Sequence, residues 1–190
     1  MTGTDIDRDE VEAKVRAAAD GDQAAFDWLI ECYSGLVWSV IRAHRLRDAD
    51  AHDVFQTTWL RLVEHLDRIR DPRAVGGWLA STSRNESLRL LRASDRTQPA
   101  PEERFEQLQA GGAAVEADLL TAERDTALWA AVNELGERCR ALLRVLMADP
   151  APSYDEVSEA LGIPVGSIGP TRGRCLTQLR QHLRTRGITR

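Results

Sequence analysis

The sequence has few aromatic residues, few cysteines and no long apolar run. Of its 190 residues, 5% are aromatic and 43% are hydrophobic, which suits packed helices better than an aromatic-rich sheet core. No uninterrupted apolar stretch approaches the roughly 20 residues that cross a bilayer, and the acidic N-terminus lacks a signal-peptide pattern. We therefore predict an all-α, cytoplasmic protein that neither spans a membrane nor is secreted.

Cysteine and histidine are too sparse to indicate a reactive centre. Cys32, Cys139 and Cys175 lie far apart and form no CxxC or Cys/His motif. We expect reduced thiols, no metal and no cofactor. An enzyme that uses a histidine with a nearby aspartate is an alternative. No HExxH, GxSxG or glycine-rich phosphate loop accompanies these residues, however. These residues are His44, His52, His65, Asp48, Asp50 and Asp53. We predict that the chain is not an enzyme.

Charge alternates along the chain. The total is −5, yet residues 41–92 carry +3 and 162–190 carry +6, whereas 1–40 carry −6 and 93–160 carry −8. Two basic blocks thus alternate with two acidic ones, and each basic block is compatible with local contact to nucleic acid. The basic residues are nearly all arginine, for which a GC-rich genome is the more economical explanation.

Apolar spacing predicts three helices in the first half of the chain. The first begins after a cap at Asp22, the second begins near Asp50 and ends before Pro72, and the third covers about 73–92. Because glycine weakens a helix start, residues 71–77 are left open as a loop. The acidic residues 1–21 are expected to be a tail or short helix; of a partner-binding arm and a frayed tail for residues 1–22, the frayed tail is favoured.

The second half separates into a linker and a helical module. Residues 97–124 are acidic and rich in proline and glycine, which is typical of a poorly ordered linker. Residues 125–187 contain a capping box at Ser153 and Glu156, a sharp Gly162-Ile163-Pro164 turn and a final helix. We therefore expect two small helical modules with separate cores, residues 22–96 and 125–187.

The segment from Ser153 to Arg184 has the pattern of a helix-turn-helix. Small residues at the start of its second helix permit close approach to a DNA backbone, and exposed arginines there suit phosphates or guanine edges. The candidate contacts are Ser167, Thr171, Arg172 and Arg174. The alternative is an ordinary helical hairpin with a solvated arginine face.

A second candidate site lies in the N-terminal module. Basic residues flank Trp78, and charge combined with stacking is how single strands are bound. A core position is the more economical interpretation of Trp78 itself, so we place more weight on the 70–77 loop and on Asn85. The full candidate set is Arg70, Arg73, Gly77, Trp78, Arg84 and Asn85.

Four stretches together resemble the extracytoplasmic-function class of the sigma-70 family. They are Asp50-Ala51-His52-Asp53-Val54-Phe55-Gln56, Gly77-Trp78-Leu79 with Arg84-Asn85, the acidic linker, and Ser153-Tyr154-Asp155-Glu156-Val157 through Leu161-Gly162-Ile163-Pro164 to Arg174. Each stretch alone is a weak match to the family, but the order and spacing of the four stretches together are specific to it. The resemblance covers about residues 20–183.

The resemblance implies a transcription-initiation subunit of bacterial RNA polymerase. Asp53, Gln56 and Thr57 would bind the polymerase core (beta and beta-prime subunits). The 22–96 module would engage the minus-ten promoter element through its candidate set and pocket a flipped base, and the 125–187 module would read the minus-thirty-five element. Promoter DNA and an anti-sigma factor are further partners that the resemblance implies. It does not imply a membrane as a partner.

The sequence departs from the family pattern at three places. Gly169-Pro170 stands where a polar or basic pair is usual, and Arg172 where an aliphatic residue is usual. Thr57 also replaces an acidic residue that often follows the glutamine. A stand-alone helix-turn-helix regulator, which would bind a palindromic duplex without polymerase, is the alternative function.

Overall fold

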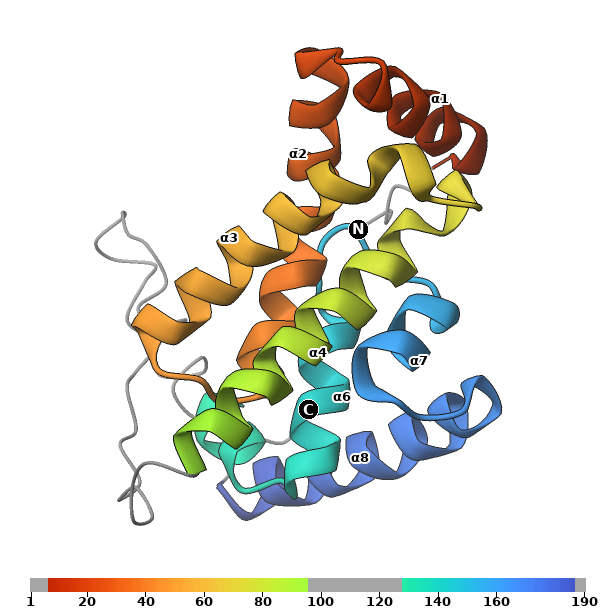
Figure 1. The fold of residues 1–190 in the computed structure, drawn as a ribbon. Coiled ribbons are helices and arrows are strands. Elements are labelled where there is room, and N and C mark those ends of the chain that lie inside the picture. Colours follow the sequence, from red (N-terminus) through yellow and green to blue (C-terminus); the bar gives the residue numbers. More distant parts are fainter. Residues whose placement is uncertain (1–6, 96–127, 187–190) are drawn as a thin grey trace, which may run out of the picture.

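The computed structural model describes residues 7–95 and 128–186, and within these ranges every regular element is a helix. The N-terminal half contains α1 (Arg8–Ala19), α2 (Gln23–Ala43), α3 (Asp48–His65) and α4 (Val75–Asp95), with 3-10 helices Leu66–Arg68 and Pro72–Ala74 before α4. The C-terminal half contains a helical segment at 128–133, then α6 (Glu137–Leu146), α7 (Tyr154–Leu161) and α8 (Val165–Thr185). The all-α prediction is confirmed; the predicted linker lies outside the described residues (Figure 1).

Local capping follows the sequence closely at two helices. The Asp22 carboxylate accepts hydrogen bonds from the backbone N–H groups of Ala24 at 2.9 Å and Ala25 at 3.2 Å, which fixes the start of α2. The capping box of α7 is complete, because the Ser153 side chain accepts from the Glu156 N–H and the Glu156 carboxylate accepts from the Ser153 N–H. These caps were predicted from residue type and spacing alone.

The start of α4 differs from the expected loop. Asp71 accepts a hydrogen bond from the Arg73 N–H at 3.1 Å and begins a 3-10 turn, from which α4 continues directly at Val75. Gly76 and Gly77 therefore lie in the first turn of α4. Val75 is fully buried, and its packing outweighs a glycine penalty of about 1 kcal/mol per residue.

The N-terminal helix α1 is part of the core. Val11, Val15 and Ala18 are buried, and α1 packs on α2 and on both 3-10 helices. Asp7 caps the helix by accepting from the Asp9 N–H at 3.0 Å. The expectation of a frayed tail is wrong for residues 8–19, because three apolar residues at helical spacing are enough to anchor this helix.

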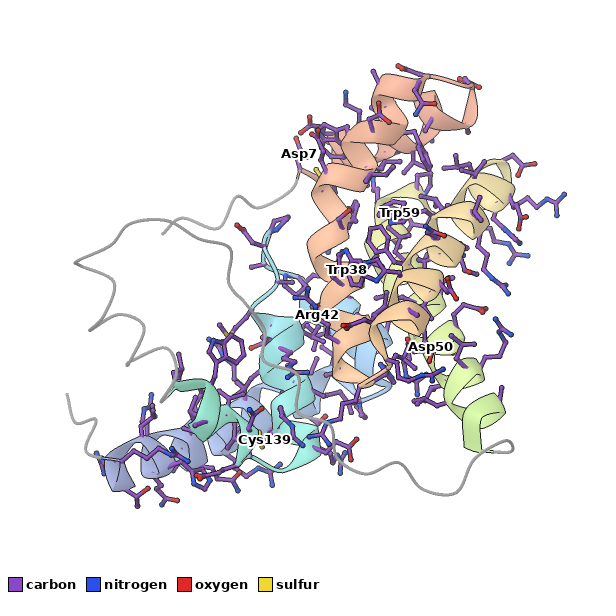
Figure 2. All side chains as sticks on the ribbon, turned by 90° about the vertical axis from the view of Figure 1, so that its left-hand side faces the viewer. Asp7, Trp38, Arg42, Asp50, Trp59 and Cys139 are labelled. Carbon is purple, nitrogen blue, oxygen red and sulfur yellow. A yellow bond between two sulfur atoms is a disulfide. The ribbon has the colours of Figure 1, made fainter. Side chains whose placement is uncertain are left out.

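Helix α2 is the central helix of the molecule. An 18-residue window within its 21 residues has a mean hydropathy of 1.2, which by length and composition alone would suffice to cross a membrane. Leu29, Val37, Val40 and Ile41 are fully buried, as expected for the core helix of a helical bundle. On one side, Trp38 stacks on Phe55 of α3 with ring centroids 4.6 Å apart (Figure 2). Polar residues interrupt the apolar sequence of this helix, so it does not stand out as an uninterrupted apolar run.

The two modules share one core. A single cluster of buried side chains runs from Val11 in α1 to Cys175 in α8. Helix α6 packs against α2, and α7 packs against α4, so that the C-terminal module lies along one side of the N-terminal module (Figure 1). The expectation of separate cores is therefore wrong for this arrangement. Both modules expose apolar helix faces, and burying these against each other removes apolar surface from water.

Two of the cysteines form a disulfide. Cys139 of α6 and Cys175 of α8 are bonded, with their Cα atoms 5.3 Å apart. The expectation of three reduced thiols is wrong for this pair, because the packing of α6 on α8 brings together residues 36 positions apart. Cys32 remains a free thiol, and partial burial raises its pKa.

Candidate polymerase and nucleic-acid interfaces

The predicted polymerase-binding residues line a shallow pocket between α3 and α4. Asp53 and Gln56 are exposed and Thr57 is half-buried. The pocket has a volume of about 310 Å³. Its lining consists of Asp53, Val54, Gln56, Thr57, Leu60, Glu86, Arg89 and Leu90. The structure thus brings all three predicted residues onto one surface with apolar neighbours.

An ion-pair network forms the α4 side of this pocket. Glu86 is buried, and its carboxylate pairs with Arg61 of α3 at 2.7 Å and with Arg89 of α4 at 2.8 Å. A buried carboxylate needs such partners, since a lone buried charge is costly. The network links α3 to α4 and fixes the pocket wall.

Two apolar residues on α3 were missed by the sequence reasoning. Leu60 is 63% exposed and Val63 is 54% exposed. They lie off the buried stripe of Val54, Thr58 and Leu62, and that departure from the helical pattern is the signal that would have identified them. Exposed apolar side chains beside polar anchors are typical of a protein-binding surface.

The six predicted minus-ten residues do not form one continuous surface. Trp78 and Asn85 are seven residues apart on α4 and therefore share a helix face, on which Trp78 is half-buried and Asn85 is exposed. The Trp78 ring also lies 6.0 Å from that of His65. Gly77 and Arg84 are also seven residues apart, but their face is turned to the C-terminal module.

Arg70 and Arg73 precede α4 and differ in their partners. Arg70 is exposed. Arg73 pairs with Glu12 and with Asp9, each at 2.7 Å, so its guanidinium is held by α1. The hydrogen bond from Arg73 lowers the pKa of Glu12, and the same bond raises the pKa of Arg73. Two carboxylates of α1 thus neutralise a residue that we predicted to meet DNA.

The helix-turn-helix has the predicted elements. Gly162 ends α7 in the left-handed conformation with φ of 63°, and the Ser158 hydroxyl donates to the Ile163 carbonyl at 2.7 Å. Helix α8 then begins at Val165, where the Ser167 hydroxyl donates to the Pro164 carbonyl at 2.7 Å. A capped helix, a glycine turn and a second helix are the elements that both the helix-turn-helix and the helical-hairpin interpretations require, so both stay open.

The predicted recognition residues do not share one side of α8: Arg172 and Arg174 lie on different flanks of the stripe formed by buried Ile168 and Cys175. Arg172 and Arg174 are exposed, whereas Ser167 and Thr171 are half-buried. The Arg174 guanidinium donates to the Thr171 hydroxyl at 3.2 Å. Pro170 lies inside the helix, beyond its first turn, and the helix assignment continues through it. Helix α8 contains no acidic residue, so its surface attracts anions.

In residues 7–95 and 128–186, no group of three or more histidine, cysteine, aspartate or glutamate side chains is placed to hold a metal ion.

Comparison with known families identifies the N-terminal module. Sigma-70 region 2 matches residues 29–97, a range that contains the α3–α4 pocket and all six candidate minus-ten residues. The chain therefore contains a segment similar to sigma-70 region 2. The predicted resemblance to the sigma-70 family is thereby supported over the N-terminal module.

A solved structure supports the fold over both modules. The structure of CnrH in complex with the cytosolic domain of CnrY matches with a TM-score of 0.61 at 20% sequence identity. The alignment covers 93% of this chain and 98% of CnrH. At this identity the likeness establishes the fold. No curated protein matches the sequence.

Proposed function

We propose that this chain is a sigma-70 family protein that binds bacterial RNA polymerase core and directs transcription initiation at a specific set of promoters. The observation that carries this proposal is the sigma-70 region 2 match over residues 29–97, combined with a helix-turn-helix in the same chain. The protein supplies binding surfaces, and the polymerase carries out the chemistry. This role places it in the cytoplasm.

The α3–α4 pocket is the proposed docking surface for the polymerase core. Asp53 and Gln56 provide exposed polar anchors, and Leu60 adds apolar area beside them. Interfaces commonly combine a small apolar centre with a polar rim. The Glu86 network holds the two helices at a fixed separation, so the docking surface is preorganised.

The start of α4 and helix α8 are the proposed promoter contacts. Trp78 and Asn85 offer an aromatic face and an amide to an unstacked base, and Arg70 offers charge to the backbone. Arg172 and Arg174 of α8 face solvent, as residues that enter the major groove must. Unstacking a base costs a few kcal/mol. We therefore propose that the promoter DNA strands open only when the polymerase already holds the duplex.

An anti-sigma protein is the proposed regulatory partner. CnrH, which shares the fold, was solved in complex with the cytosolic domain of CnrY. A protein segment of comparable kind would cover this chain's binding surfaces and keep it from the polymerase.

Abortive transcription with purified core polymerase tests the proposal. Promoter fragments are incubated with core, with and without this chain, and short RNA products are mapped. Start-site-selective RNA that requires the chain is the expected result. Its absence, together with tight binding of a palindromic duplex by the chain alone, would instead favour a stand-alone helix-turn-helix regulator.

A further inference from the structure

Four arginines gather where the end of α2 meets α6. Arg42 and Arg45 lie at the C-terminal end of α2, and Arg140 and Arg144 lie one turn apart on α6. The Arg144 guanidinium donates to the Arg42 carbonyl oxygen at 2.8 Å, so the two helices are in direct contact at this point (Figure 2). We call these four residues the arginine cluster. None of them belongs to the predicted polymerase-binding or promoter-binding sets.

Part of the arginine cluster has a purely structural role. The last carbonyl groups of a helix have no partner within the helix and attract cations, so Arg144 acts as a side-chain cap for α2. This hydrogen bond uses one of the five N–H donors of a guanidinium. Capping therefore accounts for one arginine and leaves the other three, which repel Arg144, without an explanation.

The arginine cluster is short of negative charge. Arg144 is half-buried, and desolvation, followed by the charges of the other three arginines, lowers its pKa. Within residues 7–95 and 128–186, neither Arg42, Arg45 nor Arg144 pairs with a carboxylate. The carboxylate of Asp50, which lies near the start of α3, is paired with Arg47 at 3.0 Å. A partly buried cation normally has a counter-charge, and the described residues supply none here.

Arg45 is held in an unusual backbone conformation. Its φ is 53°, and in the described part of the chain it is the one residue other than glycine with a positive φ. It follows His44, the C-cap of α2, at a position where glycine is preferred because a Cβ atom disfavours the left-handed region. No hydrogen bond or ion pair of the Arg45 side chain within the described residues offsets this cost. A disfavoured conformation without a local structural benefit points to a functional role for the side chain.

The chemistry of the arginine cluster favours phosphate groups. A guanidinium matches two phosphate oxygens with two parallel hydrogen bonds. The aromatic ring beside the cluster, Trp38, is not open to a nucleobase, because Phe55 stacks on it with centroids 4.6 Å apart and the Arg42 guanidinium lies 5.6 Å from its centroid. Single-stranded nucleic acid binds through backbone charge combined with base stacking. A compact anion with several phosphates therefore fits the cluster better than a nucleic-acid strand.

We propose that the arginine cluster binds a small polyphosphate anion, in which two or more linked phosphate groups bridge the junction of α2 and α6. Arg42 and Arg45 approach the anion from α2, and Arg140 and Arg144 approach it from α6. The bound anion neutralises like charges that the two helices bring together, so binding stabilises their contact. This site is additional to the polymerase and promoter contacts of the proposed function and does not depend on them.

Arg45→Gly is the sharpest variant, because it separates binding from folding. Glycine adopts the left-handed conformation without the penalty, so the free variant should melt at the wild-type temperature or about 2–4 °C above it. Its affinity for polyphosphate should fall about tenfold or more, because a charge-assisted contact is lost. A residue with only a structural role would not show this combination of retained stability and lost binding.

A second variant and a matched control come from the same two helices. Arg42→Gln removes an exposed guanidinium from α2, and glutamine favours a helix as arginine does. The backbone carbonyl that Arg144 contacts is retained. Arg138→Ala is the control, because it removes an exposed arginine from α6 that lies two residues from Arg140 and hence on the opposite side of the helix.

Thermal melts and isothermal titration calorimetry of the full-length chain use tripolyphosphate as the probe, at constant ionic strength and without divalent cations. At a concentration tenfold above the dissociation constant, the melting temperature of the wild type should rise by about 3–6 °C. Arg138→Ala should show the same rise. In Arg45→Gly and Arg42→Gln the rise should shrink to about 1 °C at that concentration.

Four results would overturn the polyphosphate site. They are the absence of saturable tripolyphosphate binding, binding that is unchanged in both Arg45→Gly and Arg42→Gln, equal stabilisation by sulfate or a glutamate-rich peptide, and Arg45-dependent binding of a random-sequence oligonucleotide without binding of tripolyphosphate. The last result would assign the cluster to a nucleic-acid backbone. If Arg45→Gly lowers the melting temperature of the free chain, the decision rests on Arg42→Gln. Failure of the proposed function is seen separately, as a wild-type chain that yields no promoter-selective RNA with core polymerase.

Discussion

The Arg73 guanidinium is held between two carboxylates of α1, with Nε 2.7 Å from Oε2 of Glu12 and Nη2 2.7 Å from Oδ1 of Asp9. This contact connects the first helix to the 3-10 turn that begins α4. Arg73 is half-exposed, and so the pair contributes positioning more than stability. Under the proposed function, nucleic acid competes with α1 for this arginine.

Glu12→Gln should make the chain less sensitive to acid. The pKa of Glu12 is lowered in the folded protein by its hydrogen bond with Arg73, so its contribution is present above the unfolded pKa and is lost as pH falls through the folded value. The wild-type melting temperature should therefore fall more than that of the variant between about pH 5 and about pH 3. Glu10→Gln, an exposed change in the same helix turn, is the control. Parallel pH profiles for wild type and Glu12→Gln would contradict the assignment.

The double variant Asp53→Ala, Gln56→Ala should weaken binding to polymerase core by about tenfold or more, as expected when central interface residues are truncated. Leu60→Ala should weaken binding as well, without loss of stability, because the Leu60 side chain is 63% exposed. Co-purification with core and a thermal melt measure the two properties separately. Glu64→Ala, an exposed change on the same helix, serves as the control. Core binding that is unchanged in the double variant would exclude the α3–α4 pocket as the docking surface.

Local features of the fold were predictable because they depend on residues close in sequence. The cap at Asp22, the capping box at Ser153 and the turn at Gly162 each satisfy backbone groups within a few residues. The start of α4 was not predictable in this way. Burial of Val75 and Gly76 in the assembled core outweighs the local preference of two glycines for a loop.

Relationships between distant residues were the ones that the sequence did not reveal. The Cys139–Cys175 bond and the contact of Gly35 with Asp149 depend on how helices pack, and no spacing rule encodes them. The candidate sites show the same division. Residues on one helix, such as Asp53 and Gln56, were grouped correctly, whereas the division of the minus-ten set by α7 follows from the packing of two modules.

Arg174→Ala should weaken use of the upstream promoter element. Arg174 is exposed on α8 and hydrogen-bonds to Thr171, so the arginine is available to DNA with its side chain partly oriented. Loss of a bidentate contact to guanine costs about 1–3 kcal/mol, whereas loss of a phosphate contact mainly reduces the salt dependence of binding. A footprint of the holoenzyme over the minus-thirty-five element, repeated at two salt concentrations, distinguishes these cases. Arg180→Ala, an exposed change further along α8, is the control. An unchanged footprint for Arg174→Ala would show that this face of α8 does not read the element.

Cys139→Ser should destabilise the C-terminal module and abolish its response to reducing agent. The disulfide joins α6 to α8 across 36 residues, and closing a loop of that size in the unfolded chain corresponds to about 4 kcal/mol. Urea unfolding followed by circular dichroism, with and without dithiothreitol, measures the effect. Cys32→Ser should unfold like the wild type under both conditions, because Cys32 is a free thiol. Disulfides are uncommon in cytosolic proteins, so a wild-type chain that unfolds identically with and without reductant would show that the pair is a dithiol in solution, and that α6 and α8 are held together by packing alone.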